Sequence, residues 1–355
     1  MKISRNCITY YFFAVLTTMI IAIFVIWFGI GLNTASDAEY YHQYALGIQS
    51  YATSIWPQIL YNLNQLNLYN RLTTTLFIIF LALIINPYLI IKIITNAISS
   101  NITLHQRNTL WKWQCFLLVY PSILLFSIDI YRDIPMLSIL LLSFLFLTHL
   151  HNKPFVIKLI LMLPPSYLLY EFREYLGASV LLALVASIFI NIRTQKILVP
   201  SIIFIAILAI LNSIGIFDAL FDYREIFTTL EAGSTIGINF KSNPALFPLL
   251  FILSFAYQAM GLFIYNLYSL LLFLVESLPF VFCIVYLTRN RQYINSFTNY
   301  LLIFFVIYTS IWVIGNDNLG TAMRLRIISY ITIYIAFAIT YLQKNTHNLI
   351  SSLRK

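Results

Sequence analysis

Long apolar runs separated by short polar segments recur along the whole chain. Most runs hold roughly 16–24 residues, the length that a membrane-spanning helix needs. The first run, Ile8–Leu32, is too long for the core of a signal peptide and lacks an A-x-A-like cleavage site, so we expect a retained first span. The pattern predicts an all-α polytopic integral membrane protein with about ten transmembrane helices, at 8–32, 72–91, 113–128, 134–150, 155–170, 175–192, 197–217, 266–287, 297–314 and 327–342.

One apolar stretch, Ala245–Leu262, leaves two topologies open. If it crosses the membrane, Arg289 and Arg291 lie outside together with the basic C-terminus. If it enters and returns on the same side, both basic groups lie inside, as the excess of Lys and Arg in cytoplasmic loops favours. Re-entrant segments are tolerated where protein or a water-filled cavity satisfies their backbone. We therefore expect one re-entrant segment here, with both termini in the cytoplasm.

The polar segments between the runs define the rest of the organisation. We expect a single transmembrane domain over residues 1–355, with extracytoplasmic loops at 33–70 and 218–244 and a short outer turn at 315–326. In this topology every Asp and Glu lies on the outer side except Glu276, which is in the middle of a span. Acids contribute little to orientation, so topology alone does not require that asymmetry. It indicates that the chemistry faces outward.

Composition supports the membrane class and excludes others. The chain is 61% hydrophobic and 9% charged, whereas a soluble domain carries about 25% charged residues. A formal net charge of +9 is compatible with nucleic-acid binding, but no run of Lys and Arg accompanies it, so we expect no nucleic-acid partner. The sequence has neither an H-E-x-x-H pattern nor His and Cys residues with ligand spacing, so we expect no metal site.

Arginines recur in turns on the predicted outer face. An aromatic–Arg–acid triplet occurs three times, centred on Arg132, Arg173 and Arg224. The guanidinium group is planar and permanently charged, and it binds a phosphate through two hydrogen bonds. These arginines are therefore candidates for holding an anionic substrate group. The alternative is that each arginine pairs with the neighbouring acid and stabilises its turn.

A polar turn near the C-terminus, residues 315–326, adds two further arginines. It lies between two uncharged apolar runs and carries Asp317, Arg324 and Arg326. Ionisable groups near a bilayer are costly and usually face a cavity or a ligand. We expect Arg324 and Arg326 to hold phosphate as well, with Asp317 either assisting the chemistry or orienting the arginines.

The first outer loop carries candidate general bases. Glycosyl transfer from a phosphate leaving group needs a base that deprotonates the acceptor hydroxyl, and a carboxylate within hydrogen-bond reach can serve. Asp37 and Glu39 are the carboxylates of this loop, and aromatic residues able to stack on a sugar ring follow them. The alternative for Asp37 is that it caps a helix. We expect His42 to be a hydrogen-bonding surface residue.

Two further features carry weaker signals. Glu276 interrupts an apolar run, and an acid in that position is a functional candidate, either for substrate contact or for proton coupling. Its alternative role is to brace neighbouring helices. The segment Glu231–Gly237 is rich in small residues, which can present backbone N–H groups to an anion. It lacks the Lys and the helix of a nucleotide-binding P-loop.

Taken in chain order, these features resemble multi-spanning bacterial envelope glycosyltransferases and Wzy-type polymerases of O-antigen or capsule repeat units. The resembling stretches are SDAEYYHQYA (36–45), YPSILLFSIDIYRD (120–133), YEFREYLG (170–177), Glu276 and NDNLGTAMRLR (316–326). One feature departs from the pattern. Such polymerases often have a long late outer loop rich in Arg and His, whereas 218–244 contains one Arg and no His.

The resemblance implies a membrane glycosyltransferase at the outer face of the bacterial cytoplasmic (inner) membrane. Its substrate would be a polyprenyl-pyrophosphate-linked oligosaccharide held among membrane lipid, and its activity the polymerisation of O-antigen or capsule repeat units. The outer-face arginines would hold the pyrophosphate without a cofactor. A chain-length regulator and a flippase would be its protein partners. The alternatives are a transferase of a single sugar and a transporter, or flippase, of the lipid-linked oligosaccharide.

Overall fold

The computed structural model is helical in almost all of the chain that it describes, which is residues 5–27, 37–52, 54–98, 106, 109–110, 113–114, 120–195, 198–229, 235–241 and 244–353. Within these ranges no β-strand forms, and an isolated antiparallel bridge joins Thr235 to Asn318. The predicted all-α class is confirmed. Predictions that depend on Lys2, on 28–36 or on most of 99–119, including much of the expected span 113–128, lie outside the described residues.

The chain divides into two compact units, residues 1–178 and 179–355. The boundary falls within helix α10 (Glu174–Phe189). The sequence gives no composition shift or linker at this point. The expectation of one transmembrane domain over the whole chain stays a prediction.

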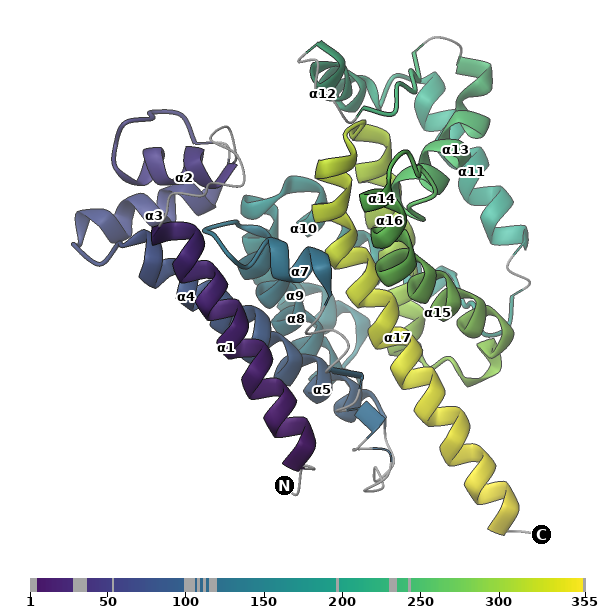
Figure 1. The fold of residues 1–355 in the computed structure, drawn as a ribbon. Helices are drawn as coiled ribbons and strands as arrows, with labels where there is room; N and C mark the ends of the chain where they lie inside the picture. Colours follow the sequence, from purple (N-terminus) through teal and green to yellow (C-terminus); the bar gives the residue numbers. More distant parts are fainter. Residues whose placement is uncertain are drawn as a thin grey trace. The chain divides into compact units, whose positions relative to one another are not determined.

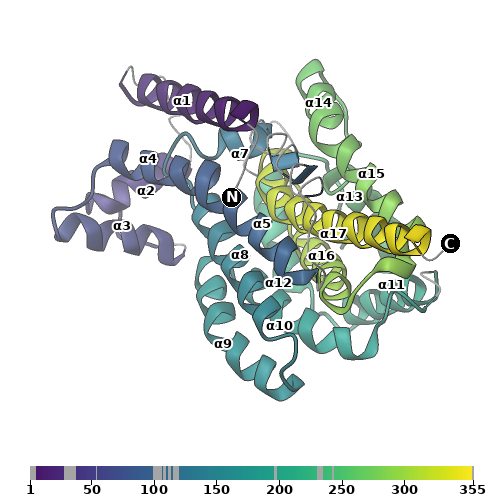
Figure 2. The same ribbon diagram turned by 90° about the horizontal axis from the view of Figure 1, so that it is seen from below.

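Unit 1 is built around helix α8 (Asp133–His149), which is buried along most of its length. Its apolar side chains leave little polar surface, so α8 packs against α5 and α9 on different sides (Figure 2). The other described helices of the unit are α1 (Arg5–Trp27), α2 (Asp37–Ala45), α3 (Ile55–Gln65), α4 (Arg71–Phe80), the π-helical η1 (Leu81–Ile85), α5 (Asn86–Ala97), α7 (Pro121–Leu125) and α9 (Phe155–Phe172).

Unit 2 is built around α17 (Leu319–Leu353), which lies beside α16 and α15 (Figure 1). Its interior is rich in aromatic side chains; Tyr330 of α17, for example, stacks on Phe280 with ring centroids 3.9 Å apart. The other described helices are α11 (Leu198–Ser213), α12 (Asp218–Thr229), η2 (Pro244–Leu246), α13 (Phe247–Gln258), α14 (Leu267–Leu272), the π-helical η3 (Phe273–Ser277), α15 (Leu278–Arg289), η4 (Arg291–Tyr293) and α16 (Ser296–Gly315).

Two long helices contain a π-helical segment that ends two residues before a proline. The segment η1 precedes Pro87, and η3 precedes Pro279. Proline has no backbone N–H to donate and crowds the preceding turn, and a π segment lets the helix continue by widening that turn. The sequence predicts a kink at Pro87, and the structure accommodates this proline in a continuous helix from Arg71 to Ala97.

Five helices in the described part of the chain are long and apolar enough to cross a membrane: Arg71–Ala97, Phe155–Phe172, Leu267–Arg289, Ser296–Gly315 and Leu319–His347. A sixth results if Val199–Ser213 and Asp218–Glu225, which meet at 81°, form one broken span. Several apolar helices at expected spans, including Asp133–His149, are shorter. The structure therefore supports an all-α membrane protein.

Helix α13 is the core of the segment expected to be re-entrant. Its 12 residues extend about 18 Å at 1.5 Å per residue, less than the roughly 30 Å of a bilayer's hydrocarbon core. The chain then leaves the helix through Gly261, at φ 68°, and enters the candidate span Leu267–Arg289. This geometry is compatible with the expected re-entrant path, which stays a prediction.

Candidate functional site

Arg71 connects the first polar segment of unit 1 to the turn that precedes α8. Asn70 caps α4 by accepting hydrogen bonds from backbone N–H groups of the first turn, which places Arg71 at the start of the helix. Its Nε and Nη2 donate to the two oxygens of Asp129 at 3.0 and 2.7 Å, and its Nη1 donates to Glu39 at 2.8 Å. Bidentate arginine–carboxylate pairs are among the stronger polar contacts. Arg71 therefore ties three segments together.

His42 lies one turn after Glu39 on α2. Its Nδ1 is 2.8 Å from the hydroxyl of Tyr69. Burial lowers the pKa of His42 and Arg71 lowers it further, against the opposing charges of Glu39 and Asp129. Burial also raises the pKa of Tyr69. Both side chains are therefore uncharged at neutral pH, and the charge in this cluster belongs to the arginine and the two carboxylates.

The turns that carry the first two arginine triplets meet in unit 1. Arg173 Nη2 lies 3.7 Å from Oδ1 of Asp133, and both side chains are buried. Arg132 Nη1 donates to the carbonyl oxygen of Phe172 at 3.3 Å. The arginine of one triplet thus pairs with the acid of the other. These contacts hold the beginning of α8 beside the end of α9.

Arg132 uses its donors differently from Arg71. Within the described residues, the buried Nε–H of Arg132 has no hydrogen-bond partner. A buried donor left without a partner costs about 1–3 kcal/mol, and an unsatisfied group in a native structure calls for an explanation such as an absent ion or ligand. Arg132 therefore has a donor that an anionic ligand could use.

Arg224 and Asp317 form a buried clamp in unit 2. The Nη2 of Arg224 pairs with Asp317 Oδ1, and its Nε donates to the carbonyl oxygen of Ile238 at 2.9 Å. Its Nη1 donates to backbone carbonyl groups at the C-terminal end of α16. The ring of Phe240 covers the guanidinium, with its centroid 4.6 Å from Cζ. Every guanidinium nitrogen of Arg224 has an acceptor inside the protein.

The same clamp fixes the segment 235–241. The second carboxylate oxygen of Asp317 accepts a hydrogen bond from the backbone N–H of Gly237 at 2.9 Å. The backbone N–H of Ile236 donates to the Asp317 carbonyl at 3.0 Å. Asp317 therefore orients both an arginine and a loop. The arginine is Arg224, and the expected orientation of Arg324 and Arg326 by Asp317 stays a prediction. The remainder of the small-residue segment, Glu231–Ser234, lies outside the described residues.

Gln258, at the end of α13, holds the C-terminal polar turn from another direction. Its Nε2 donates to the carbonyl oxygens of Val313 and Asn316 at 3.2 and 2.8 Å. Asn316 returns a hydrogen bond from Nδ2 to the Gln258 Oε1 at 2.6 Å. Because Gln258 and Asn316 are buried, these contacts satisfy groups that would otherwise be costly. These hydrogen bonds hold the turn in place where α17 begins.

Unit 2 contains a second buried polar group, which is formed by Arg326, Tyr330 and Ser277. The Tyr330 hydroxyl lies 2.9 Å from Ser277 Oγ and donates to the carbonyl oxygen of Ala259 at 2.8 Å. Arg326 interacts electrostatically with Tyr330. Among the described residues, its buried Nε–H has no hydrogen-bond partner. Arg326 and Arg132 are thus alike in having an Nε–H donor that no described residue accepts.

Glu276 and Arg324 lie close to this group in the sequence. Glu276 is fully buried in η3, beside Ser277, and it interacts electrostatically with Tyr330 and Tyr268. Arg324 is half-buried, two residues before Arg326 on α17. π-Helical segments occur frequently at functional sites. The position of Glu276 therefore fits either a functional role or the bracing role that its sequence context allows.

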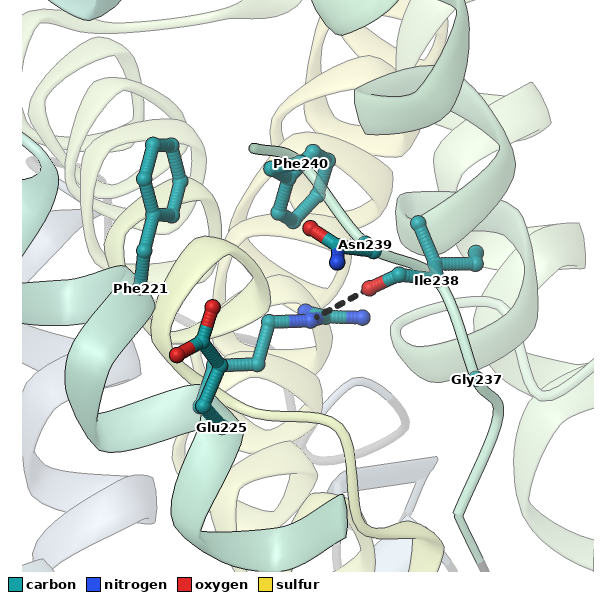
Figure 3. A pocket seen from close by; sticks show the side chains of 7 residues that line it. Phe221, Glu225, Gly237, Ile238, Asn239 and Phe240 are labelled. Carbon is teal, nitrogen blue, oxygen red and sulfur yellow. Dashed lines mark hydrogen bonds between the residues drawn. The ribbon is translucent and has the colours of Figure 1, made fainter. Parts of the chain in front are cut away.

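A small pocket lies over the Arg224 side chain, between α12 and the segment 237–240 (Figure 3). Its volume is about 60 Å³, which accommodates a few water molecules and falls below the roughly 300–1,000 Å³ of typical ligand sites. Glu225 on its rim lies 3.1 Å from Lys241. Hydrogen bonds to Asp222 and Glu225 raise the pKa of Lys241, which stays charged. This pocket is too small for a saccharide.

A larger cavity, of about 590 Å³, lies among α11, α13, α15 and α16 in unit 2. Its walls are almost entirely apolar and include Phe204, Phe251, Phe255, Ile284 and Phe305. A cavity of this size and lining accommodates a hydrocarbon chain. The helices α13 and α16 that line it continue to Gln258 and Asn316, the residues that fix the C-terminal polar turn.

The structure distributes the predicted residues over both units. Unit 1 contains Asp37, exposed at the start of α2, and Glu39, Arg132 and Arg173. Unit 2 contains Arg224, Glu276, Asp317, Arg324 and Arg326. The roles assigned to these residues stay predictions.

Sequence reasoning missed the contributions of Arg71, Asp129, Gln258 and Asn316. For Arg71 a signal existed, because it is the only Lys or Arg between Arg5 and Lys92. The two amides had no comparable signal. Gln258 and Asn316 are 58 residues apart in the chain, and only the folded structure shows that they bond to each other.

Comparisons with known proteins place the chain in no family. No protein-family model matches it, and neither a curated protein nor a solved structure shows significant similarity. Among the described residues, no group of three or more His, Cys, Asp and Glu side chains is placed to hold a metal ion. The function must therefore be argued from the geometry of the polar clusters.

Proposed function

We propose that the protein is a membrane glycosyltransferase that polymerises O-antigen or capsule repeat units carried on polyprenyl pyrophosphate. The observation that carries the proposal is that Arg132 and Arg326 each keep a buried Nε–H without a partner among the described residues. In an apolar protein such donors call for an acceptor. A pyrophosphate group supplies several, with a charge that arginine binds well.

Within unit 1, a polar cluster supplies a candidate base in the same unit as Arg132. The turn 129–133 carries both Asp129, which joins Arg71 and Glu39, and Arg132. A carboxylate and an anion-binding arginine therefore belong to one connected part of the unit. Glu39 is engaged by Arg71, whereas Asp37 is exposed at the start of α2. In our proposal Asp37 deprotonates the acceptor hydroxyl, and Glu39 positions α2.

The cavity of unit 2 supports a lipid-linked substrate. Its apolar lining suits an isoprenoid chain, and its volume of about 590 Å³ accommodates part of one. Arg326 and the half-buried Arg324 would then bind phosphate at the end of α17 where the polar turn begins. Arg224 serves in this proposal as a positioning residue, because its donors are engaged within the protein.

The proposal includes a topology and a location. It has ten spans, one re-entrant segment around α13, both termini in the cytoplasm, and polar turns at the outer face of a bacterial inner membrane. A chain-length regulator and a flippase act with the enzyme. No cofactor takes part, because the leaving pyrophosphate already activates the sugar.

One observation favours a second candidate, a transporter of the lipid-linked oligosaccharide. Glu276 is fully buried in a π-helical segment of a candidate span. Acids within spans frequently belong to proton relays and substrate pathways. A transporter would use Glu276 for coupling and would bind the same pyrophosphate.

Surface polysaccharide from a deletion strain, compared with complemented strains by gel ladder, separates the two functions. Loss of a polymerase leaves one unlengthened repeat on the lipid core, whereas loss of a flippase leaves no repeat. In complemented strains we expect Arg132→Ala and Arg326→Ala to reduce polymer at least about tenfold, because a charge-assisted hydrogen bond contributes about 1.5–3 kcal/mol.

The control substitution removes a cation that the proposal does not assign to the substrate. Lys153→Ala removes an exposed basic residue at a predicted inner turn of unit 1 and should leave the ladder unchanged. Membrane levels of each variant are measured by immunoblot. A normal ladder from both arginine variants at normal levels would overturn the proposal.

A further inference from the structure

The helical hairpin formed by α2 and α3 exposes apolar side chains at both of its turns. After α2, Leu46 and Ile48 are exposed, Ile48 to 69%. After α3, Leu66 and Leu68 are exposed to 66% and 67%. Scattered single exposed apolar residues are normal, but apolar residues gathered at neighbouring turns indicate an interaction surface. α2 and α3 pack against each other, so the turns belong to one rigid element.

Some polar side chains of this hairpin make contacts within unit 1. Glu39 bonds to Arg71 at the start of α4, and His42 bonds to Tyr69 in the hairpin's own second turn. Trp56 of α3 is buried and donates to the carbonyl oxygen of Ile130 at 2.9 Å. The hairpin therefore has polar contacts on the side of unit 1 and exposes both apolar and polar side chains at its turns. Exposed leucines and isoleucines beside polar residues suit a boundary between lipid and water.

The exposed apolar side chains lie in two turns with defined hydrogen-bonded backbone geometry. Gly47 has φ 77° and its N–H bonds to the Tyr44 carbonyl at 2.9 Å. Asn67 has φ 57°, and the N–H of Leu68 bonds to the Leu63 carbonyl at 2.8 Å. Both turns are helix-ending motifs in which a glycine or asparagine adopts the left-handed conformation. The exposure of Leu66 and Leu68 is thus built into the backbone.

The position of the hairpin along the chain sets its depth in a membrane. Leu68 is three residues before the candidate span Arg71–Ala97, whose 27 residues extend about 40 Å at 1.5 Å per residue. This exceeds the roughly 30 Å hydrocarbon core, so the end at Arg71 reaches the headgroup region. Phe77 and Phe80 are exposed on the same helix and continue the apolar surface into the core.

The composition of the hairpin fits this depth. No Lys or Arg occurs between residues 33 and 70, whereas six tyrosines and one tryptophan do, at 40, 41, 44, 51, 61, 69 and 56. Tyr and Trp are enriched at membrane–water interfaces. Of these aromatic residues, Tyr51 and Tyr61 are exposed, to 75% and 37%. The hairpin thus exposes tyrosines as well as apolar turns, as expected of an element at a membrane–water interface.

We propose that the α2–α3 hairpin lies in the membrane interface and inserts its two apolar turns into the lipid leaflet that surrounds the N-terminal end of the helix Arg71–Ala97. Its partner is the lipid surface. The described residues of this segment, 37–52 and 54–70, are then a membrane-embedded element and not a loop in water. The inference stands apart from the proposed function, because it holds for an enzyme and a transporter alike.

Spin-label accessibility tests the proposal in the full chain. Single cysteines replace Leu66, Leu68 or Ile48 in protein whose Cys7 and Cys115 are changed to Ser; Cys283 stays, because it is buried. Each is labelled with a nitroxide and reconstituted into phosphatidylethanolamine–phosphatidylglycerol vesicles. Collision rates with oxygen, which concentrates in lipid, and with a water-soluble nickel chelate are then compared.

We expect labels at all three positions to show an oxygen-to-nickel ratio several times that of the control Asn62→Cys, an exposed polar site on α3. The ratio should approach that of Phe77→Cys, on the candidate span. Nickel access at 48, 66 and 68 equal to that at 62 would place the turns in water and overturn the proposal. Low access to both reagents would show that protein covers the turns, and would overturn it as well.

Discussion

At the residue scale, the arginines of this protein separate by how their donors are used. Arg71 binds two carboxylates, and Arg224 binds one carboxylate and several backbone carbonyls. Arg132 and Arg326 each keep a buried Nε–H without a partner in the described chain. An arginine whose donors are all bonded within the protein stabilises the fold, whereas a buried donor without a partner needs a further explanation, which in our proposal is a bound anion. The sequence shows the same residue type in similar turns and cannot make this distinction.

The Arg224–Asp317 clamp predicts a large effect of one substitution. Asp317→Ala leaves a buried guanidinium without its counter-charge and releases the segment held through Gly237. We expect the free energy of unfolding to fall by roughly 3–5 kcal/mol, measured as a lower thermal unfolding temperature in detergent by intrinsic fluorescence.

The matched control for that variant is Asp222→Ala in the same unit. Asp222 pairs with Lys241 at 2.7 Å, but its side chain is 71% exposed, and exposed ion pairs contribute little. The unfolding temperature should hardly change. Equal losses from the two substitutions would contradict the structural role of the clamp.

At the scale of the elements, unit 2 depends on a close approach between the turn after α13 and the helices beside it. A Cβ at Gly261 would collide with Ser277 Oγ and would lie 3.1 Å from Arg326 Nη1. Gly261 also has φ 68°, which costs other residues about 1–2 kcal/mol. The turn therefore closes over the Arg326 group only because residue 261 has no side chain.

Gly261→Ala should consequently destabilise the protein more than Gly237→Ala. Gly237 has a similar φ of 75°, but a Cβ there meets nothing within 4 Å. Both variants incur the backbone strain. Only Gly261→Ala adds steric overlap with neighbouring atoms, which costs about 1–3 kcal/mol more. Thermal unfolding of the two proteins measures the difference.

A Ser277→Ala background identifies the cause. Removing the Ser277 hydroxyl should reduce the cost of Gly261→Ala, a coupling that a double-mutant cycle reports. If the two glycine variants unfold at the same temperature, the turn does not pack as the structure shows.

At the scale of the whole molecule, the number of spans depends on whether each short apolar helix crosses the membrane. Five described helices are long enough to cross a membrane by themselves, and α13 is too short to do so. A re-entrant α13 keeps Arg289 and Arg291 on the cytoplasmic side. A crossing α13 would reverse the side of everything that follows.

Cysteine labelling in cells decides between these topologies. A cysteine at the exposed Gln292, in η4, should react with an impermeant maleimide only after permeabilisation. A cysteine at Asp222 should react in intact cells. Labelling of position 292 in intact cells would show that the segment 247–258 crosses the membrane.

The sequence by itself determined the class of this protein and the positions of its polar turns. Apolar runs far longer than a soluble domain tolerates are a property of composition, and they fix helical membrane segments without reference to distant residues. The polar turns at 129–133, 171–174 and 315–326 are visible for the same reason, because charges in an apolar chain stand out.

Only the tertiary structure decided which groups meet in those turns. Arg71 and Asp129 are 58 positions apart, and Arg224 and Asp317 are 93 apart. Local pairing within the triplets was an equally valid expectation from the sequence, yet Arg173 pairs with the acid of another turn. Hydrogen bonds act over about 3 Å, so partner choice depends on helix packing, which no local pattern encodes.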